Sequence, residues 1–318
     1  MRLKLVPEKT SVNFLGMSKA AGGLSVIAVI VAIAAYIVMG LNFGIDFRGG
    51  TTVEIKTEGP ADLTQIRGIL SDLDLGDVSV QEFGAVDEVL IRVEQQSSGD
   101  NADAAVASTV QAALAEAMPG VEIRRVEEVG PVVSGELIQA GVLAVMLAVF
   151  AVLVYIWLRF EWQFSVGAVA ALVHDVVLTI GVFAVFQLEF NLSIIAALLT
   201  IVGYSLNDTV VVFDRVRENL RRFKTKALDD VLNLSINETL SRTVMTSVTT
   251  LIALGSLYVL GGEIIRGFTF GMIWGVLVGT YSSVFVASAV LRALGVKRDW
   301  SKPDDTGAGV QFGSPDAP

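Results

Sequence analysis

Six stretches of the chain are apolar over about the length that crosses a bilayer, roughly 20 residues each. Hydrophobic residues make up 53% of the sequence and charged residues only 18%, a balance unlike that of a soluble domain. The chain is therefore predicted to be an α-helical membrane protein. The six predicted transmembrane helices cover residues 20–40, 137–158, 163–187, 192–213, 243–260 and 267–291.

Basic residues predict the orientation of these spans. They cluster in residues 1–19, between the second and third spans, in the predicted loop 214–242, and at the end of the chain. With six spans all four places lie on one side, so both termini and that loop are predicted to be cytoplasmic. The first span is predicted to be an uncleaved anchor, because it is too long for the apolar part of a signal peptide. The tail, residues 293–318, is predicted to be disordered.

Residues 41–136, between the first two spans, carry most of the negative charge, with 18 acidic and 6 basic residues. Alternating and helix-spaced apolar residues give the order β-α-β-β-α-β, which predicts a ferredoxin-like α+β domain. The orientation places this domain on the side opposite the termini. It contains no histidine, no paired catalytic carboxylates and no Gly-rich phosphate loop. We expect a moving or binding part with no enzymatic role.

An acidic residue lies inside the fourth predicted span. Asp208, in the stretch "GYSLNDTVVVFDRVREN", lies about six residues, or roughly 9 Å, from the end of that span. A charge at this depth is costly, so the carboxylate should face protein or a water-filled crevice. Arg242 and Thr246 form a polar stripe at the start of the fifth span, within reach of Asp208. A carboxylate that alternates between an arginine and a proton is a workable proton carrier, whereas a static ion pair or a polar helix end beside Asn207 is the structural alternative.

His174 and Asp175 lie near the centre of the third span, and His174 is the only histidine in the chain. Adjacent helical residues point about 100° apart, so we expect these two side chains to serve separate contacts. A proton relay and a buried hydrogen-bonded pair that holds helices together both fit this position.

Two glycine patterns concern packing and hinges. Gly267, Gly271, Gly275 and Gly279 recur at four-residue intervals in the sixth span, the small-xxx-small pattern of close helix contact. The stretch "LNFGIDFRGGT" follows the first span. Its Gly49 and Gly50 indicate a tight turn, and Asp46 and Arg48 would sit at the membrane interface. A rigid hinge between membrane and domain and a plain loop are equal alternatives.

Several classes of site are excluded or not predicted. The chain has no cysteine, so disulfides and thiolate metal sites are impossible. No nucleotide-binding or hydrolase motif is visible, so we predict no ATPase activity. No metal, organic cofactor or nucleic-acid partner is predicted.

These motifs carry a family resemblance. The stretches "GIDFRGGT", "HDV", "GYSLNDTVVVFDRVREN" and "SRTVMTS" occur in the order of the SecF group of bacterial protein-export membrane proteins, in the SecD/SecF family. The resemblance extends from the first span to about Arg298. It implies half of a transporter of the resistance-nodulation-division superfamily, in the bacterial inner membrane.

The resemblance also implies partners and roles. The chain would pair with SecD, associate with the SecYEG channel and accessory translocon proteins, and act on unfolded preproteins. The proton gradient would drive release on the periplasmic side, with Asp208 and Arg242 as proton-transfer residues and residues 41–136 as a periplasmic domain. Two other functions stay open: a proton-coupled efflux transporter for small molecules, and a passive scaffold of the translocon.

Overall fold

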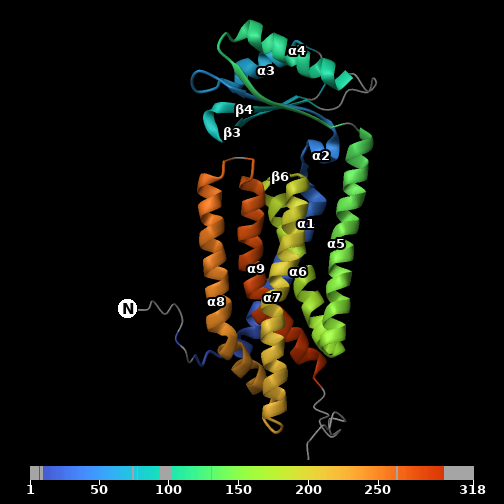
Figure 1. Ribbon diagram of the computed structural model, residues 1–318, viewed down its shortest axis with the longest axis vertical. Coiled ribbons are helices and arrows are strands. Elements are labelled where there is room, and N and C mark those ends of the chain that lie inside the picture. Colours follow the sequence, from blue (N-terminus) through green and yellow to red (C-terminus); the bar gives the residue numbers. More distant parts are fainter. Residues whose placement is uncertain are drawn as a thin grey trace, which may run out of the picture.

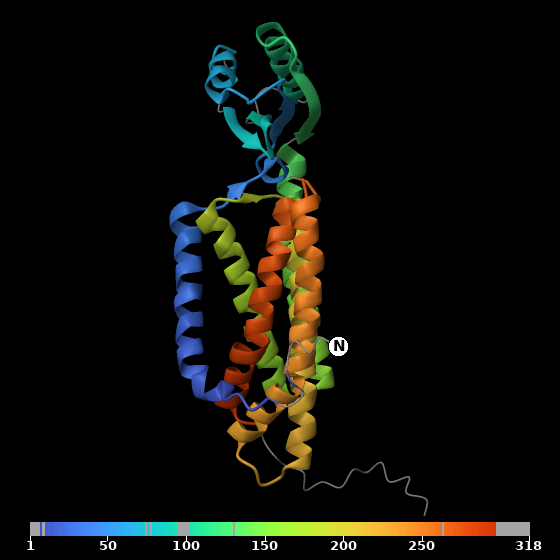
Figure 2. The same ribbon diagram turned by 90° about the vertical axis from the view of Figure 1, so that its left-hand side faces the viewer.

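The computed structural model describes residues 7, 10–73, 75–76, 78–93, 102–129, 131–262 and 264–296. Within these ranges six helices are long and apolar enough to cross a membrane, as the hydropathy pattern predicts. They run roughly side by side along the long axis of the molecule, and a small sheet domain lies beyond one end of the bundle (Figure 1, Figure 2). The six helices are α1 (Phe14–Met39), α5 (Pro131–Arg159), α6 (Trp162–Phe186), α7 (Leu192–Arg222), α8 (Leu228–Leu260) and α9 (Arg266–Leu294).

The predicted loop at 214–242 is wrong as a description of the backbone. Helix α7 continues to Arg222 and α8 begins at Leu228, so only a short turn separates them. Residues 228–242 of the predicted loop form the first part of α8. Its apolar side chains, Val231, Leu232 and Ile236, are buried against Val216 and other residues at this end of the bundle. The amphipathic face is therefore covered by the protein.

The bundle has a central and a peripheral set of helices. Helices α6, α7 and α9 pack against one another, and about half of the residues in their apolar segments are buried. Helices α1, α5 and α8 bury few residues and expose large apolar side chains along their lengths, such as Ile37, Phe150 and Ile252. Helices α1 and α5 are the most apolar of the six, whereas α7 and α9 carry buried polar side chains such as Asp208 and Ser282, and polar side chains within a membrane face other helices rather than lipid.

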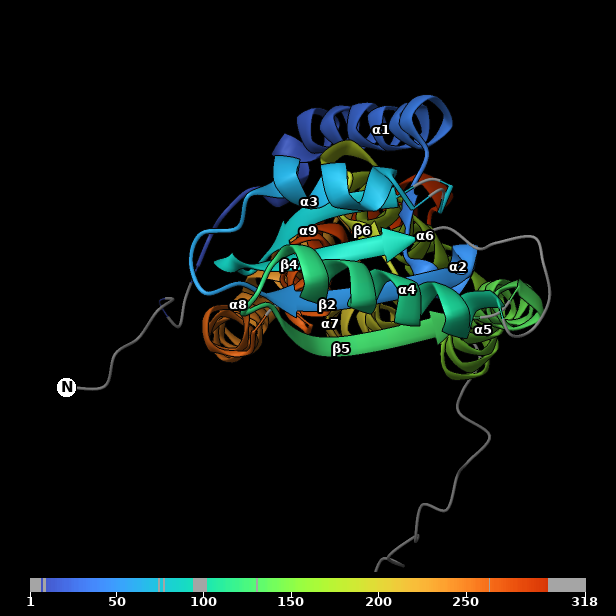
Figure 3. The same ribbon diagram turned by 90° about the horizontal axis from the view of Figure 1, so that it is seen from above.

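The extramembrane domain has the predicted β-α-β-β-α-β order. Strand order in its antiparallel sheet is β3-β4-β2-β5, which is the split βαβ arrangement. Both helices lie on the sheet face that points away from the bundle (Figure 3), and Asp62 caps the first of them by accepting from the Thr64 and Gln65 amides. The domain's elements are β2 (Gly50–Lys56), α3 (Leu63–Ser71), β3 (Val78–Phe83), β4 (Ala85–Val93), α4 (Ala102–Ala117) and β5 (Glu122–Val129).

Short elements join this domain to the bundle. Strand β1 (Asn42–Phe43) pairs in parallel with β6 (Glu189–Phe190), which lies in the connection between α6 and α7. A one-turn helix, α2 (Ile45–Arg48), then leads into β2. The rings of Phe43, Phe47 and Phe190 pack together at centroid distances of 5.8–6.1 Å. The junction between the domain and the bundle therefore has a small hydrophobic core of its own.

Candidate functional site

Asp208 is buried inside the bundle with an incomplete set of hydrogen bonds. The residue lies within α7 and is only 3% exposed. Its Oδ2 atom is buried and has no hydrogen-bond partner among the residues that the structure describes. A buried carboxylate normally has its oxygens paired, because desolvation of an unpaired one costs several kcal/mol or more. Asp208 therefore has the capacity to accept a proton or a moving donor.

The partners nearest to Asp208 come from α8. Thr246 and Arg242 lie close enough to act on its carboxyl group, and the Thr246 hydroxyl itself donates to the Thr243 carbonyl at 2.9 Å. The two charges form no direct ion pair within the described part of the chain, and Arg242 is exposed on the bundle surface. Asn207 is also exposed, so it does not line the buried site. The structure thus places Arg242 near Asp208 without neutralising it by contact.

A second polar contact joins the same two helices. Tyr204, one turn before Asp208, donates its hydroxyl to Thr250 Oγ1 at 3.2 Å. Thr250 lies one turn after Thr246, so polar side chains occur at successive turns of α8 beside α7. Polar side chains along this helix pair allow a sliding helix to exchange hydrogen bonds at small cost.

Asp175 has the opposite environment to Asp208, because its oxygens are fully engaged. It is 0% exposed. Its Oδ2 accepts from Ser205 Oγ of α7 at 2.6 Å and from Ser282 Oγ of α9 at 2.7 Å. These contacts tie the three central helices together at one carboxylate. Neither serine is predicted as a site residue from the sequence, although Ser205 lies one helical turn from Asp208 and faces inward with it.

His174 contacts its own neighbour, which fits the alternative of a buried hydrogen-bonded pair and contradicts the expectation of separate contacts. His174 Nδ1 lies 2.9 Å from Asp175 Oδ1, because rotation about the two side chains closes the angle between their directions. The imidazole stacks on Tyr281 at a centroid distance of 6.1 Å. Tyr281 in turn donates to the Ala21 carbonyl of α1 at 2.7 Å. Through Tyr281, the His174–Asp175 pair therefore links the hydrogen bonds around Asp175 to the peripheral helix α1.

The glycines of α9 form a line of close contacts. A Cβ at Gly271 would meet Phe183 at 3.5 Å, one at Gly279 would meet Ser205 at 3.0 Å, and one at Gly275 would overlap Ile201. Gly267 has a single neighbour within 4 Å of such a Cβ, Ile194 at 3.5 Å. Three of these four neighbours belong to α7, so the glycine row lets α9 approach the helix that carries Asp208.

Asp46 joins the stretch after α1 to the start of α7. Its Oδ2 accepts the backbone N–H of Leu192, the first residue of α7, at 2.7 Å. Asn191, at the N-cap position, makes no side-chain cap, so Asp46 supplies this role from a distant part of the chain. A carboxylate at a helix N-terminus also stabilises the helix dipole. Arg48 is exposed and makes no contact of this kind in the described structure.

Gly49 and Gly50 have the backbone conformations that the predicted turn requires. Their φ angles are +72° and +115°, in regions that side chains disfavour. Gly50 begins β2 and pairs with β5. The chain therefore passes from the Asp46 contact into the central part of the sheet within four residues.

The described residues contain no group of three or more side chains able to hold a metal ion.

Two family models match the sequence. The C-terminal model of the protein export membrane protein SecD/SecF matches residues 109–297, and the SecD/SecF GG motif matches residues 37–61, which include Asp46, Gly49 and Gly50.

Similar proteins cover the whole chain. A protein translocase subunit SecF of Cereibacter sphaeroides is 51% identical over 322 residues, covering 99% of both chains. A protein of the same name from Rhodobacter capsulatus is 48% identical, again over 99% of both chains. The crystal structure of SecDF, a translocon-associated membrane protein from Thermus thermophilus, has a TM-score of 0.82 at 33% identity, covering 92% of this chain.

The chain spans 40% of the length of that SecDF chain. A second SecDF structure, described as a super-membrane-facing form, has the same identity but a TM-score of 0.67. The arrangement of the present chain is the nearer to the first.

Proposed function

The chain belongs to the SecD/SecF family of protein-export membrane proteins, and from this premise we propose that it converts the proton-motive force into assistance for preprotein translocation. Its place in Sec-dependent translocation, as a multi-pass protein of the inner membrane, follows from relatives of about 50% identity over the full chain. The finer steps of the mechanism are the proposal: which residue carries the proton, and how the extramembrane domain responds.

The observation that carries the proposal is the contrast between two buried carboxylates. Asp175 has its oxygens engaged by Ser205, Ser282 and His174, whereas Asp208 keeps one oxygen without a partner in the described structure. A carboxylate held by two hydroxyl donors and an imidazole is fixed in place, and one with a free oxygen can change partners. Asp208 is therefore the proton carrier, with Thr246 as a polar neighbour and Arg242 as a nearby positive charge.

Protonation would change what Asp208 attracts. The charged form favours the approach of Arg242, because opposite charges interact strongly where the dielectric is low. The neutral form has no such attraction and can donate a hydrogen bond instead. A shift of α8 against α7 would follow each change of state, and the Tyr204–Thr250 contact lies on the path of that shift.

Asp46 connects this shift to the extramembrane domain. It holds the first turn of α7, and the chain continues from it into β2 through Gly49 and Gly50. Strand β1 pairs with β6 at the same place, and Arg92 of β4 forms a 2.7 Å ion pair with Glu189 of β6. Movement of α7 is transmitted to the sheet through these contacts.

The partners follow from the family and from the exposed helices. Association with SecD is the role that SecF and SecDF naming supports, and the apolar outer faces of α5 and α8 leave room for such a chain. SecYEG, accessory translocon proteins and the unfolded preprotein are further partners in the proposal. Both termini are cytoplasmic and the sheet domain is periplasmic.

Proton flux through the reconstituted complex with SecD tests the assignment. A pH-sensitive dye inside proteoliposomes reports proton entry when a gradient is imposed. We expect the Asp208→Asn variant to lose the flux above that of empty liposomes, because an amide cannot exchange a proton in this range. Flux equal to that of the unmodified complex would overturn the role of Asp208.

A further inference from the structure

An apolar groove lies between α1 and α5 on the side of the bundle. Its volume is about 470 Å³, within the range of cavities that hold organic ligands. Helices α1 and α5 both pack against α6, which forms the floor of the groove together with the start of α7. The lining includes Ile33 of α1, Val145 of α5, Ile180 of α6 and Leu198 of α7. Met146, on the α5 wall, is exposed, so the groove is open toward the surrounding bilayer.

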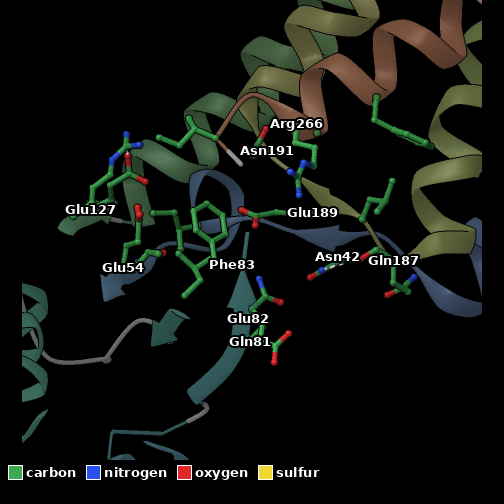
Figure 4. A pocket seen from close by; sticks show the side chains of 18 of the residues that line it. Asn42, Glu54, Gln81, Glu82, Phe83, Glu127, Gln187, Glu189, Asn191 and Arg266 are labelled. Carbon is green, nitrogen blue, oxygen red and sulfur yellow. Dashed lines mark hydrogen bonds and ion pairs between the residues drawn. The ribbon is translucent and has the colours of Figure 1, made fainter. Parts of the chain in front are cut away.

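The paired strands β1 and β6 separate this groove from a polar cleft beneath the sheet domain. Asn42 and Glu189 line the cleft (Figure 4). The next residue of each strand, Phe43 or Phe190, lines the groove, because successive side chains of a strand point to opposite faces. The strand pair therefore has a polar face toward the domain and an apolar face toward the spans. It marks the edge of the hydrocarbon layer on this side of the membrane.

Aromatic rings close the end of the groove that is nearest the domain. Phe43, Phe47 and Phe190 line it there, in the segments that follow α1 and precede α7. Their rings pack against one another. A transmembrane helix in the groove would have to pass through these rings to leave the membrane, whereas an acyl chain can enter from the open side. The closed end therefore favours a lipid over a helix as the occupant.

The lining and the length of the groove also match an acyl chain. Among the residues that line it, only Tyr36 carries a hydroxyl or a charge, so the groove offers too few polar partners to hold water. Along α5 it extends from Ile138 to Met146, about 12 Å at 1.5 Å per residue. One leaflet contributes half of a hydrocarbon core of roughly 30 Å. The groove thus matches one leaflet in depth.

A cation lies at the headgroup end of the groove. Asp46 binds the backbone N–H of Leu192 at the start of α7, which places α2 at the end of the spans. Arg48 follows Phe47 in α2, is exposed, and forms no ion pair with the described residues. Helix α2 packs against α5, one wall of the groove. Because a guanidinium binds phosphate oxygens through two parallel N–H groups, a phosphate beside Arg48 and an acyl chain in the groove can belong to one molecule.

We propose that this groove binds one phospholipid of the leaflet on the side of the sheet domain. One acyl chain lies along α6 between α1 and α5, and the phosphate binds Arg48. The acyl chain supplies the contacts that the lining side chains lack in an empty groove, and it supports the rings of Phe43, Phe47 and Phe190 from below. The bound lipid is thus part of the junction between the bundle and the domain. The proposal is independent of the proton role of Asp208.

Lipid photocrosslinking tests the location. A phospholipid with a diazirine halfway along one acyl chain is reconstituted with the complex of this chain and SecD. The complex is then washed in detergent and illuminated, so that only retained lipid reacts, and the labelled residues are mapped by mass spectrometry. We expect label on Ile180 and Leu198 in the floor, and little on Phe150, which is exposed on α5 outside the groove. Labelling of Phe150 at or above the level of the floor would overturn the proposal.

A filled groove tests the fit. Val145→Trp places a ring in the groove, and Leu147→Trp places the same ring at an exposed position of α5 outside it. We expect Val145→Trp to lower the label in the floor about fivefold or more, because the ring takes the space of the acyl chain, and Leu147→Trp to leave it unchanged. Co-purification with SecD checks assembly, and Met146→Trp at the rim replaces Val145→Trp if that variant does not assemble. Equal labelling of the filled and control variants would contradict the proposal.

Competition between lipids tests the phosphate contact. An unlabelled phospholipid and a diacylglycerol with the same acyl chains each compete with the photoreactive lipid. We expect the phospholipid to compete about fivefold more strongly, as a charge-assisted contact with Arg48 requires. Arg48→Gln should remove this preference, and Arg48→Lys should keep part of it. Equal competition by the two lipids in the unmodified complex, or an unchanged preference in Arg48→Gln, would overturn the role of Arg48.

A photoreactive amino acid at position 146 distinguishes a lipid from a protein in the groove. Met146 lines the groove and is exposed, so a probe there reaches whatever occupies it. In membranes that hold the intact complex, we expect crosslinks to phospholipid. Crosslinks mainly to SecD would show that a protein covers the groove and would overturn the proposal.

Discussion

At the scale of single residues, the two buried carboxylates differ in how completely they are hydrogen-bonded. Asp175 receives hydroxyl hydrogen bonds from two other helices, which makes it a structural node. Asp208 leaves an oxygen unpaired in the described structure, which makes it the better candidate for a group that changes state. In the sequence, Asp175 and Asp208 are both acidic residues within predicted spans. Only the hydrogen-bond partners around each carboxylate distinguish them.

Replacement of Asp175 should destabilise the fold. In Asp175→Ala, Ser205 and Ser282 lose their common acceptor, and we expect a loss of about 1–3 kcal/mol in the free energy of unfolding. Thermal unfolding in detergent, followed by size-exclusion chromatography, measures the effect. Asp208→Asn is the control and should unfold at nearly the normal temperature. Equal midpoints for Asp175→Ala and the unmodified chain would contradict the structural role.

At the scale of elements, α7 is the helix on which the contacts converge. It carries Asp208, receives Asp46 at its first residue, and faces the glycine row of α9. Its buried face packs against α6 and α9, and its Tyr204 side chain forms a hydrogen bond with α8. A displacement of α7 would therefore reach both the proton site and the extramembrane domain.

The glycine row should be sensitive to a single methyl group. In Gly275→Ala the new Cβ would overlap Ile201, and we expect a loss of about 1–3 kcal/mol through overpacking. Gly203→Ala, on the open side of α7 with no atom near its Cβ position, should leave stability unchanged or slightly higher. Thermal midpoints of the two variants give the comparison, and similar midpoints would count against close packing.

The Asp46 contact should couple the domain to α7. We expect Asp46→Ala to lose gradient-stimulated export while the complex stays assembled, because the first turn of α7 loses a cap worth about 0.5–2 kcal/mol. Asp46→Asn keeps an acceptor oxygen and should retain most of the stimulation. Export assays on inverted vesicles measure both variants. If Asn is as inactive as Ala, the negative charge and not the cap is what matters.

Much of this organisation could be predicted from the sequence. The spans follow from hydropathy, the domain follows from its alternating strands, and Asp208 follows from a charge in an apolar stretch. The length of α7 and α8 beyond the membrane could not be read in this way, because the residues after Phe213 are polar and helical periodicity alone does not separate a surface helix from a loop. The serine partners of Asp175 and the cap made by Asp46 depend on contacts between distant segments, which hydropathy does not report.

At the scale of the whole molecule, the structure is one part of a larger assembly. Central helices α6, α7 and α9 are well covered, whereas α1, α5 and α8 bury little, and the chain spans 40% of a solved SecDF chain. The sheet domain rests on one end of the bundle through the Asp46, β1–β6 and Arg92–Glu189 contacts.

Labelling of single cysteines should show the orientation of the chain. The sequence contains no cysteine, so Ser71→Cys on α3 and Thr225→Cys between α7 and α8 each provide a unique thiol at an exposed position. A membrane-impermeant maleimide should label Ser71→Cys in intact spheroplasts and Thr225→Cys only after permeabilisation. The reverse pattern would place the sheet domain in the cytoplasm.

The most direct test of the central claim is gradient-dependent export by the Asp208→Asn complex. The variant is co-expressed with SecD, its assembly is checked by co-purification, and completion of preprotein export into inverted vesicles is timed with and without a proton gradient. The account predicts an intact complex whose export no longer accelerates with the gradient. An intact complex that still accelerates as the unmodified one does would make Asp208 a structural residue and the chain a scaffold.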